Sequence, residues 1–187
     1  MHLNELKRTQ FGPLLDLKLK FSSHVLWALL LREANVDKTS ERWFVIHGMP
    51  IRFSVEEYAL ITGLSCIRIP ANEEEVHRSL SESVFLRKHF PNVPCCVDKL
   101  KENLKELVDD FLQKGGPKVV DMDIIRVALL LLVGGVLTPK DRTYNVINKK
   151  SLELIDDVDQ FNRFPWGAHS FRYMLKSVKH KLSLIHI

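Results

Sequence analysis

The chain has 187 residues, of which 45% are hydrophobic and 27% charged, and its formal net charge is only +4. A chain of this length can bury one core without disulfides or a structural metal, so we expect a single domain over residues 1–187. The small net charge argues against a dedicated nucleic-acid-binding domain. The longest apolar run, 127–137, is too short for a membrane-spanning helix, which needs about 20 residues.

The cysteines and the N-terminal segment both favour an intracellular protein. Three cysteines form an odd set, and Cys95 and Cys96 are adjacent, so a framework of structural disulfides is not expected. Charged residues interrupt the apolar positions throughout the first thirty residues, so this segment lacks the apolar core of a signal peptide.

The first predicted element is a helix over 22–34, in which Val25, Leu26, Leu29 and Leu30 recur at helical spacing. Because apolar residues cover most of its surface, we expect this helix to be largely buried.

A β-hairpin is predicted next. Residues 43–46 are aromatic and β-branched, His47 and Gly48 suit a turn, and 49–53 return as a second strand. Pro50 places this second strand at an edge or near its start.

The helix after the hairpin has recognisable signals at both ends. Ser54 and Glu57 have the spacing of a capping box, in which each side chain bonds the backbone N–H of the other residue. Gly63 can adopt the left-handed conformation that closes a helix. The hairpin and this helix should therefore form one compact unit.

Five further helices are predicted from apolar spacing and boundary residues: 73–89, 98–114, 121–133, 150–158 and 168–182. Asp98 is the expected cap of the second of these, and Asp121 or Asp123 the cap of the third. Gly134 and Gly135 should stop that third helix. The fold class is thus mainly α, with six or seven helices in a globular bundle and one short β-hairpin at about 43–53.

No catalytic, cofactor-binding or metal site is predicted. Cys95, Cys96 and His89 are the nearest approach to a metal or thiol site, but the second half of a zinc motif is missing. The eight histidines are scattered, and none lies in a signature specific to a hydrolase. The thiols are better interpreted as small buried residues.

The C-terminal helix carries the one local charge asymmetry. Residues 168–187 contain four basic residues and no acidic one, which equals the whole net charge of the chain. Arg172, Lys176 and Lys179 lie opposite an apolar stripe, so they could neutralise phosphates of a nucleic acid. The alternative is an ordinary solvated helix face.

Three segments resemble one known family: 29–33 (LLLRE), 43–66 (WFVIHGMPIRFSVEEYALITGLSC) and 164–167 (FPWG), the last followed by Ser170 and Phe171. They are similar to the plant domain of unknown function numbered nineteen eighty-five, over roughly residues 10–182. The similarity extends more distantly to the plant mobile domain.

This resemblance implies a setting and no activity. Domains of this family typically occur in plant proteins of transposable-element origin, often upstream of a protease domain for SUMO, a ubiquitin-like protein. It therefore implies a nuclear location. The three cysteines do not sit in a pattern like the nucleophile of such a protease, so no catalytic residue is carried over to this chain.

The family-like residues also have a structural interpretation, in which aromatic rings pack the hairpin and the last helix, glycines permit turns and polar side chains cap helices. They are Trp43, Phe44, Gly48, Arg52, Phe53, Ser54, Glu57, Gly63 and Trp166. Arg52 is a charge in an apolar strand, so we expect it to face solvent or to pair with Glu33 or Glu56.

Three functional hypotheses remain. The first is a non-catalytic interaction or targeting module with an unidentified protein partner and no cofactor, and the alternative is a nucleic-acid-binding module that uses Arg172, Lys176 and Lys179. An enzyme would require histidines and carboxylates far apart in the sequence to meet in one deep pocket. The sequence does not indicate the oligomeric state.

Overall fold

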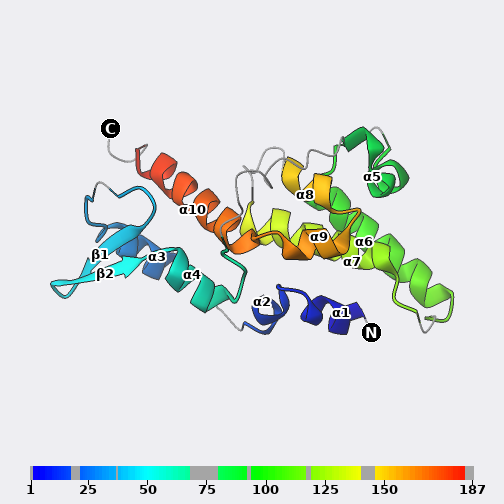
Figure 1. The fold of residues 1–187 in the computed structure, drawn as a ribbon, viewed down its shortest axis with the longest axis horizontal. Coiled ribbons are helices and arrows are strands. Elements are labelled where there is room, and N and C mark those ends of the chain that lie inside the picture. The colour runs from blue at the N-terminus through cyan, green and yellow to red at the C-terminus, as the bar shows by residue number, and fades with distance from the viewer. Residues whose placement is uncertain are drawn as a thin grey trace. The chain divides into compact units, whose positions relative to one another are not determined.

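The computed structural model describes residues 2–17, 22–36, 38–67, 80–91, 94–116, 119–139 and 146–183, with the backbone alone at 81 and 179–183. Contacts group the chain into two compact units, drawn in Figure 1. Unit 1 comprises residues 1–10 and 69–164, and unit 2 comprises 11–68 and 165–187. The single domain stays a prediction, because a grouping of contacts does not measure whether the units fold independently.

Unit 1 is helical. Its elements are α1 (His2–Arg8), η1 (Leu80–Glu82), α5 (Val84–His89), α6 (Val97–Gln113), α7 (Met122–Leu131), η2 (Leu132–Leu137), α8 (Lys149–Leu154) and α9 (Val158–Arg163). Helix α7 packs against both α6 and α1. Its buried side chains, with Leu100 of α6 and Phe161 of α9, form the core of this unit.

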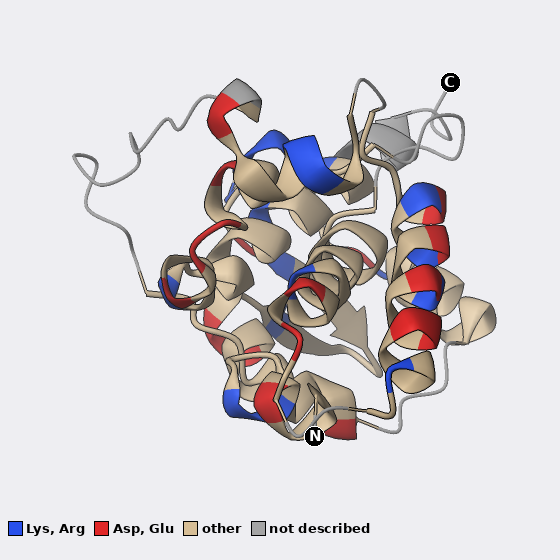
Figure 2. Cartoon of the chain, turned by 90° about the vertical axis from the view of Figure 1, so that its right-hand side faces the viewer, with Lys and Arg blue, Asp and Glu red and all other residues tan. Residues whose placement is uncertain are grey.

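Helix α6 follows the amphipathic pattern that predicts it. Leu100 is fully buried, whereas the outer face carries interspersed lysine, aspartate and glutamate, visible as blue and red stripes in Figure 2. The predicted cap is wrong by two positions, because Cys96 occupies the N-cap and Asp98 lies in the first turn. There the negative charge of Asp98 still favours the helix dipole.

Helix α7 is capped by Asp121, one of the two predicted caps, but the helical backbone does not end at Gly134 and Gly135. The Asp121 carboxylate accepts a hydrogen bond from the Asp123 N–H at 2.9 Å, so Asp121 is the cap. The π-helix η2 then continues the chain through Gly134 and Gly135. Gly134 lies against Ile147, where a Cβ would collide, so this glycine permits close packing and not a helix end.

Two predicted helices are interrupted. Of the helix expected over 73–89, the part before residue 80 lies outside the described residues, and the remainder forms η1 and α5. The Ser83 hydroxyl accepts from the Leu86 N–H at 3.1 Å and so starts α5 afresh. The helix expected over 150–158 is likewise α8 and α9, because Asp157 caps α9.

Unit 2 contains the hairpin. Its elements are α2 (Gly12–Asp16), α3 (Ser23–Leu30), β1 (Arg42–Ile46), β2 (Met49–Phe53), α4 (Val55–Thr62) and α10 (Trp166–Ser183). The prediction of a mainly α fold with one antiparallel hairpin is confirmed. The described residues hold ten α-helices and not six or seven, because α1 and α2 were not predicted and the helix expected over 150–158 forms both α8 and α9.

The hairpin is closed by a two-residue turn. Ile46 pairs with Met49, and the intervening His47 and Gly48 have φ values of 51° and 77°. Positive φ at both positions is what a type I′ turn requires, and its twist matches that of the strands. Gly48 thus has the turn role that the sequence predicts.

Pro50 explains why β2 is an edge strand. The pair that flanks a two-residue turn is hydrogen-bonded, so the next pair, Val45 with Pro50, is not. The backbone nitrogen of Pro50 therefore points away from β1, so its lack of an N–H removes no hydrogen bond between the two strands. The other edge of β1 is covered by the backbone of Arg32, whose carbonyl accepts from the Val45 N–H at 2.9 Å.

Helix α10 packs against α4 and the hairpin. The Phe171 ring lies 5.9 Å from the Phe53 ring and 5.4 Å from the Tyr58 ring, measured between centroids. The Tyr58 hydroxyl lies 3.0 Å from the Ser170 hydroxyl, and Trp166 is completely buried. The predicted packing role of Trp166 is confirmed.

Helix α3 contradicts its sequence prediction. The Ser22 hydroxyl caps it, but no residue of α3 is buried, and Trp27 and the following Leu31 are 49% and 68% exposed. The helix is attached at its C-terminal end, where Arg32 bonds β1, and the described residues leave most of its apolar surface uncovered.

Candidate functional site

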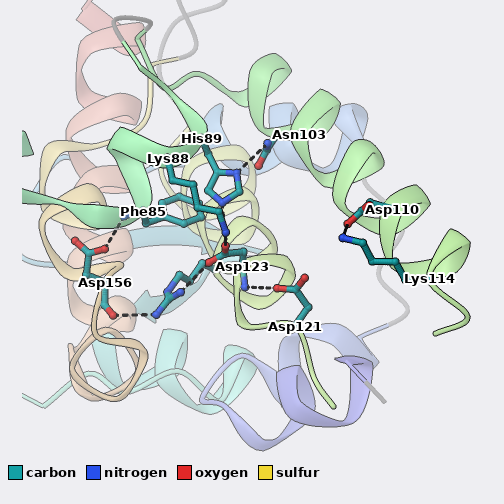
Figure 3. A network of polar contacts seen from close by, with 10 residues as sticks. Phe85, Lys88, His89, Asn103, Asp110, Lys114, Asp121, Asp123 and Asp156 are labelled. Carbon is teal, nitrogen blue, oxygen red and sulfur yellow. Dashed lines mark hydrogen bonds and ion pairs between the residues drawn. The ribbon is translucent and has the colours of Figure 1, made fainter. Parts of the chain in front are cut away.

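Asp123 is the centre of a polar network in unit 1 (Figure 3). One of its carboxylate oxygens lies 2.5 Å from Lys88 Nζ and 3.0 Å from His89 Nε2, and the other accepts from Arg126 at 2.8 Å. Its side chain is only 13% exposed. Although burial alone would raise the pKa of Asp123, these three hydrogen bonds hold it well below the usual value.

The position of His89 is fixed from both sides of its ring. Its Nε2 faces the carboxylate of Asp123, and its Nδ1 lies 3.3 Å from the side-chain nitrogen of Asn103. Both ring nitrogens of His89 therefore have a hydrogen-bond partner. The hydrogen bond that the Lys88 ammonium group donates to Asp123 raises the pKa of Lys88.

Arg126 carries the network on to the junction between α8 and α9. Its second terminal nitrogen donates to the backbone carbonyl of Asp156 at 3.2 Å, and the Asp156 carboxylate accepts from the Phe85 N–H at 3.0 Å. Helices α5 and α7 and the α8–α9 junction are therefore joined by side-chain hydrogen bonds. This connection accounts for the network as a structural feature of unit 1.

A cavity of about 620 Å³ lies beside this network. Its walls include Ser83, Phe85, Lys88, Arg126, Leu152 and Asp156. The Ser83 hydroxyl is occupied as the α5 cap, and the Asp123 carboxylate already accepts from three donors. Neither group is therefore free to act as a nucleophile or a general base in this arrangement.

The cysteines and histidine considered for a metal site do not converge. Cys95 is buried, and burial together with the neighbouring Cys96 raises the pKa of its thiol to about 12. His89 instead faces Asp123 and Asn103. Within the described part of the chain, no group of three or more histidine, cysteine, aspartate or glutamate residues could hold a metal ion. No helix there is long and apolar enough to cross a membrane.

The predicted basic face is partly described. Arg172 and Lys176 are exposed and lie four residues apart on α10, so they share one helix face. Lys179 belongs to the same helix, but its side chain lies outside the described residues. A nucleic-acid or partner contact through these residues stays a prediction.

The family-like residues around the hairpin make structural contacts. Ser54 and Glu57 form the predicted capping box, and the Ser54 hydroxyl and N–H together with Arg52 lower the pKa of Glu57 to about 2. Arg52 lies 2.7 Å from Glu56 and 3.0 Å from Glu57. Of its two expected partners, Glu56 is therefore right, whereas Glu33 pairs with Arg42 at 2.9 Å.

Two family-like aromatic residues of the hairpin differ in how well they match the predicted packing. Phe53 packs on α10 as predicted, but Trp43 is only half-buried, with its indole N–H donating to the Glu41 carboxylate at 2.9 Å. Gly63 closes α4 with φ of 69°, and a Cβ there would lie 2.8 Å from Pro13.

Unit 2 also exposes an apolar surface that the sequence analysis missed. We name it the α3–hairpin surface and define it by Trp27 and Leu31 of the α3 segment and by Met49 and Ile51, which share one face of the hairpin; all four are between 45% and 68% exposed. The sequence signal was ambiguous, because a helix that is apolar all round is normally buried. The Asp123 network was missed for another reason, since Lys88 and His89 lie more than thirty residues before Asp123 in the sequence.

The fold and the site define a mainly helical protein with one β-hairpin, a tied polar network and an exposed apolar surface. A family model described as a domain of unknown function (DUF1985) matches residues 30–177, and the chain belongs to this family. The resemblance read from the hairpin region is thereby confirmed. No curated protein and no solved structure matches the chain.

Proposed function

We propose that this chain is a non-catalytic interaction module that binds a protein partner through unit 2. The observation that supports this is the α3–hairpin surface, where four large apolar side chains are at least 45% exposed on neighbouring elements. Soluble proteins rarely leave large contiguous apolar patches in water, and such patches often mark interaction sites. The occupied polar groups beside the unit 1 cavity also favour binding over catalysis.

In the natural protein, we propose that the module works in the nucleus beside a SUMO-protease-type domain of a transposon-derived plant protein. The chain belongs to the family, and this setting is only what the resemblance to that family implies. Cleavage of a SUMO precursor by the purified chain would contradict the non-catalytic assignment.

Site-specific photo-crosslinking tests the proposed function. A photoreactive amino acid is placed at Leu31 in the chain expressed in cells of its source organism, and at Leu112 of α6 as a control of similar exposure, 64%. We expect crosslinks to a discrete protein from position 31 but not from 112, and their loss when Trp27 and Met49 are changed to Gln. Absence of crosslinks at 31, or the same pattern at both positions, would refute the proposal.

Nucleic-acid binding through α10 is the second candidate. It is supported by the exposed Arg172 and Lys176 and by the charge of unit 2, whose residues include eleven Lys and Arg but six Asp and Glu. Changing Arg172, Lys176 and Lys179 to Gln should abolish binding to labelled duplex DNA, single-stranded DNA or RNA with little change in the thermal midpoint. An unchanged affinity would exclude this role.

A further inference from the structure

The α3–hairpin surface has a defined attachment to the rest of unit 2. The Val45 N–H donates to the Arg32 carbonyl at 2.9 Å, which holds Leu31 and the end of α3 beside β1. In Figure 1 the turn of the hairpin points away from α4 and α10. Met49 lies next to this turn and is 68% exposed. Met49 and Ile51 are two residues apart on β2, so they share one face of the hairpin. The end of α3 exposes Leu31 beside the edge of β1.

A partner strand is a poor occupant of this surface. Arg32 and the following residues already cover the outer edge of β1. The outer edge of β2 includes Pro50, which has no N–H to donate, and the charged Arg52. Proline and charged residues at an edge oppose strand addition. An occupant must therefore bind through side chains, as a helix does when it lays its apolar face on a complementary surface.

The charges of unit 2 indicate which charge the bound segment should carry. Four of its carboxylates are already paired with cations: Glu33 with Arg42, Glu41 with Lys38, and both Glu56 and Glu57 with Arg52. Arg32, Arg172 and Lys176, by contrast, make no ion pair with any carboxylate that the structure describes. The accessible charge left over is therefore positive.

Arg32 places a positive charge at the C-terminal end of α3. It follows Leu31 directly, and its backbone carbonyl is bonded to Val45. Its guanidinium donates to the Ala28 carbonyl at 2.8 Å, which holds it at the C-terminal end of α3. An acidic side chain that reaches this end of α3 would find a fixed positive group beside apolar contacts.

We infer that the α3–hairpin surface binds a helical segment of a partner protein that carries an apolar stripe flanked by aspartate or glutamate. Apolar side chains such as Leu31, Met49 and Ile51 favour a protein partner over a nucleic acid, because they cannot donate hydrogen bonds to phosphates. The inference rests on the proposed function and adds the chemical class of the partner.

The test uses two fluorescent helical peptides with the full chain. Both carry leucine at alternating three- and four-residue spacing, and the flanking positions are glutamate in one and lysine in the other. We expect the glutamate peptide to bind at least about tenfold more tightly, which corresponds to about 1.4 kcal/mol. The preference should weaken as salt is raised, because exposed charges are screened.

Matched variants locate the binding. Leu31→Gln and Met49→Gln should each weaken binding of the glutamate peptide several-fold, whereas Leu112→Gln on α6 should not. Arg32→Gln should reduce the preference for glutamate over lysine, whereas Arg172→Gln should leave it unchanged. Circular dichroism of each variant checks that the fold is kept, which these exposed positions favour.

Equal affinity for the two peptides, no binding of either, or no effect of Leu31→Gln and Met49→Gln would overturn the inference. If duplex DNA displaces the glutamate peptide and Arg32→Gln abolishes DNA binding, the surface would be assigned to nucleic acid instead. Protein crosslinks from position 31 without a preference for glutamate would refute only this inference. Absence of crosslinks would refute the proposed function itself.

Discussion

Arg42 of β1 donates a hydrogen bond to the backbone carbonyl of Leu175 in α10 at 3.0 Å, across 133 positions of the sequence. A second nitrogen of the same guanidinium donates to Glu33 at 2.9 Å. The two side chains are 18% and 14% exposed, so the ion pair is largely desolvated. Arg42 thus ties the hairpin to the C-terminal helix.

Arg42→Gln is therefore expected to lower the free energy of unfolding by about 3 kcal/mol, because it leaves the Glu33 carboxylate buried without its cation. Urea denaturation at neutral pH measures this loss. The double change of Arg42 and Glu33 to Met should recover most of it, since removing both charges also removes the desolvation cost. Arg32→Gln, at an exposed arginine, should change stability by less than about 0.5 kcal/mol. An equal loss from both arginines would contradict the assigned role of Arg42.

The two family-like tryptophans should differ in their contribution to stability. Trp166 is completely buried, so Trp166→Ala is expected to cost about 3–5 kcal/mol. Trp43 is half-buried, and its indole N–H donates a hydrogen bond to Glu41. Trp43→Ala should therefore lower the free energy of unfolding by about 2 kcal/mol or less. Denaturant unfolding of both variants checks the order, and a larger loss at Trp43 would mean that its ring anchors the core.

Local signals in the sequence account for much of the fold. The capping box at Ser54 and Glu57, the turn at Gly48 and the glycine that ends α4 are determined by neighbours a few residues away, and each is confirmed. The amphipathic pattern of α6 also identifies its buried side, because its apolar and charged residues separate clearly.

Features that depend on distant parts of the chain were not predictable. The exposure of α3 depends on which elements fail to cover it, and its apolar sequence would suit a buried helix equally well. The close packing of Gly134 against Ile147 joins residues that no local pattern brings together. The Asp123 network joins residues from α5 and α7, so only the folded chain brings them together.

Gly167 should tolerate no side chain. Its N–H donates to the Ser65 carbonyl at 2.9 Å, and an added Cβ would lie 2.7 Å from that oxygen and collide with Cys66 Sγ. Gly167→Ala is therefore expected to destabilise the protein by about 1–3 kcal/mol, the usual cost of overpacking. Gly135→Ala is the control, because its Cβ would meet only Val97 at 3.8 Å. Thermal unfolding of both variants distinguishes them, and a neutral Gly167→Ala would show that this contact relaxes without cost.

The Asp123 network should make the protein sensitive to acid. Three hydrogen bonds hold the pKa of Asp123 below its unfolded value of about 3.9 despite its burial, so the folded state binds fewer protons than the unfolded state. The resulting stabilisation is complete above about pH 5 and is lost as the pH falls towards the folded-state pKa. Each unit of pKa difference corresponds to about 1.4 kcal/mol.

Asp123→Asn should therefore lower stability at pH 7 by more than about 1 kcal/mol and flatten its decline between about pH 5 and pH 3. Urea denaturation across this range measures both effects. Asp110→Asn is the matched control, because Asp110 is 57% exposed and pairs only with Lys114 at the surface of α6 (Figure 3). The loss of stability on acidification that remains in Asp123→Asn should come in part from Glu57. The pKa of Glu57 is lowered to about 2 in the folded state, so its protonation also destabilises the fold. An acid profile of Asp123→Asn that parallels the unmodified protein would show that Lys88, His89 and Arg126 do not stabilise the ionised carboxylate.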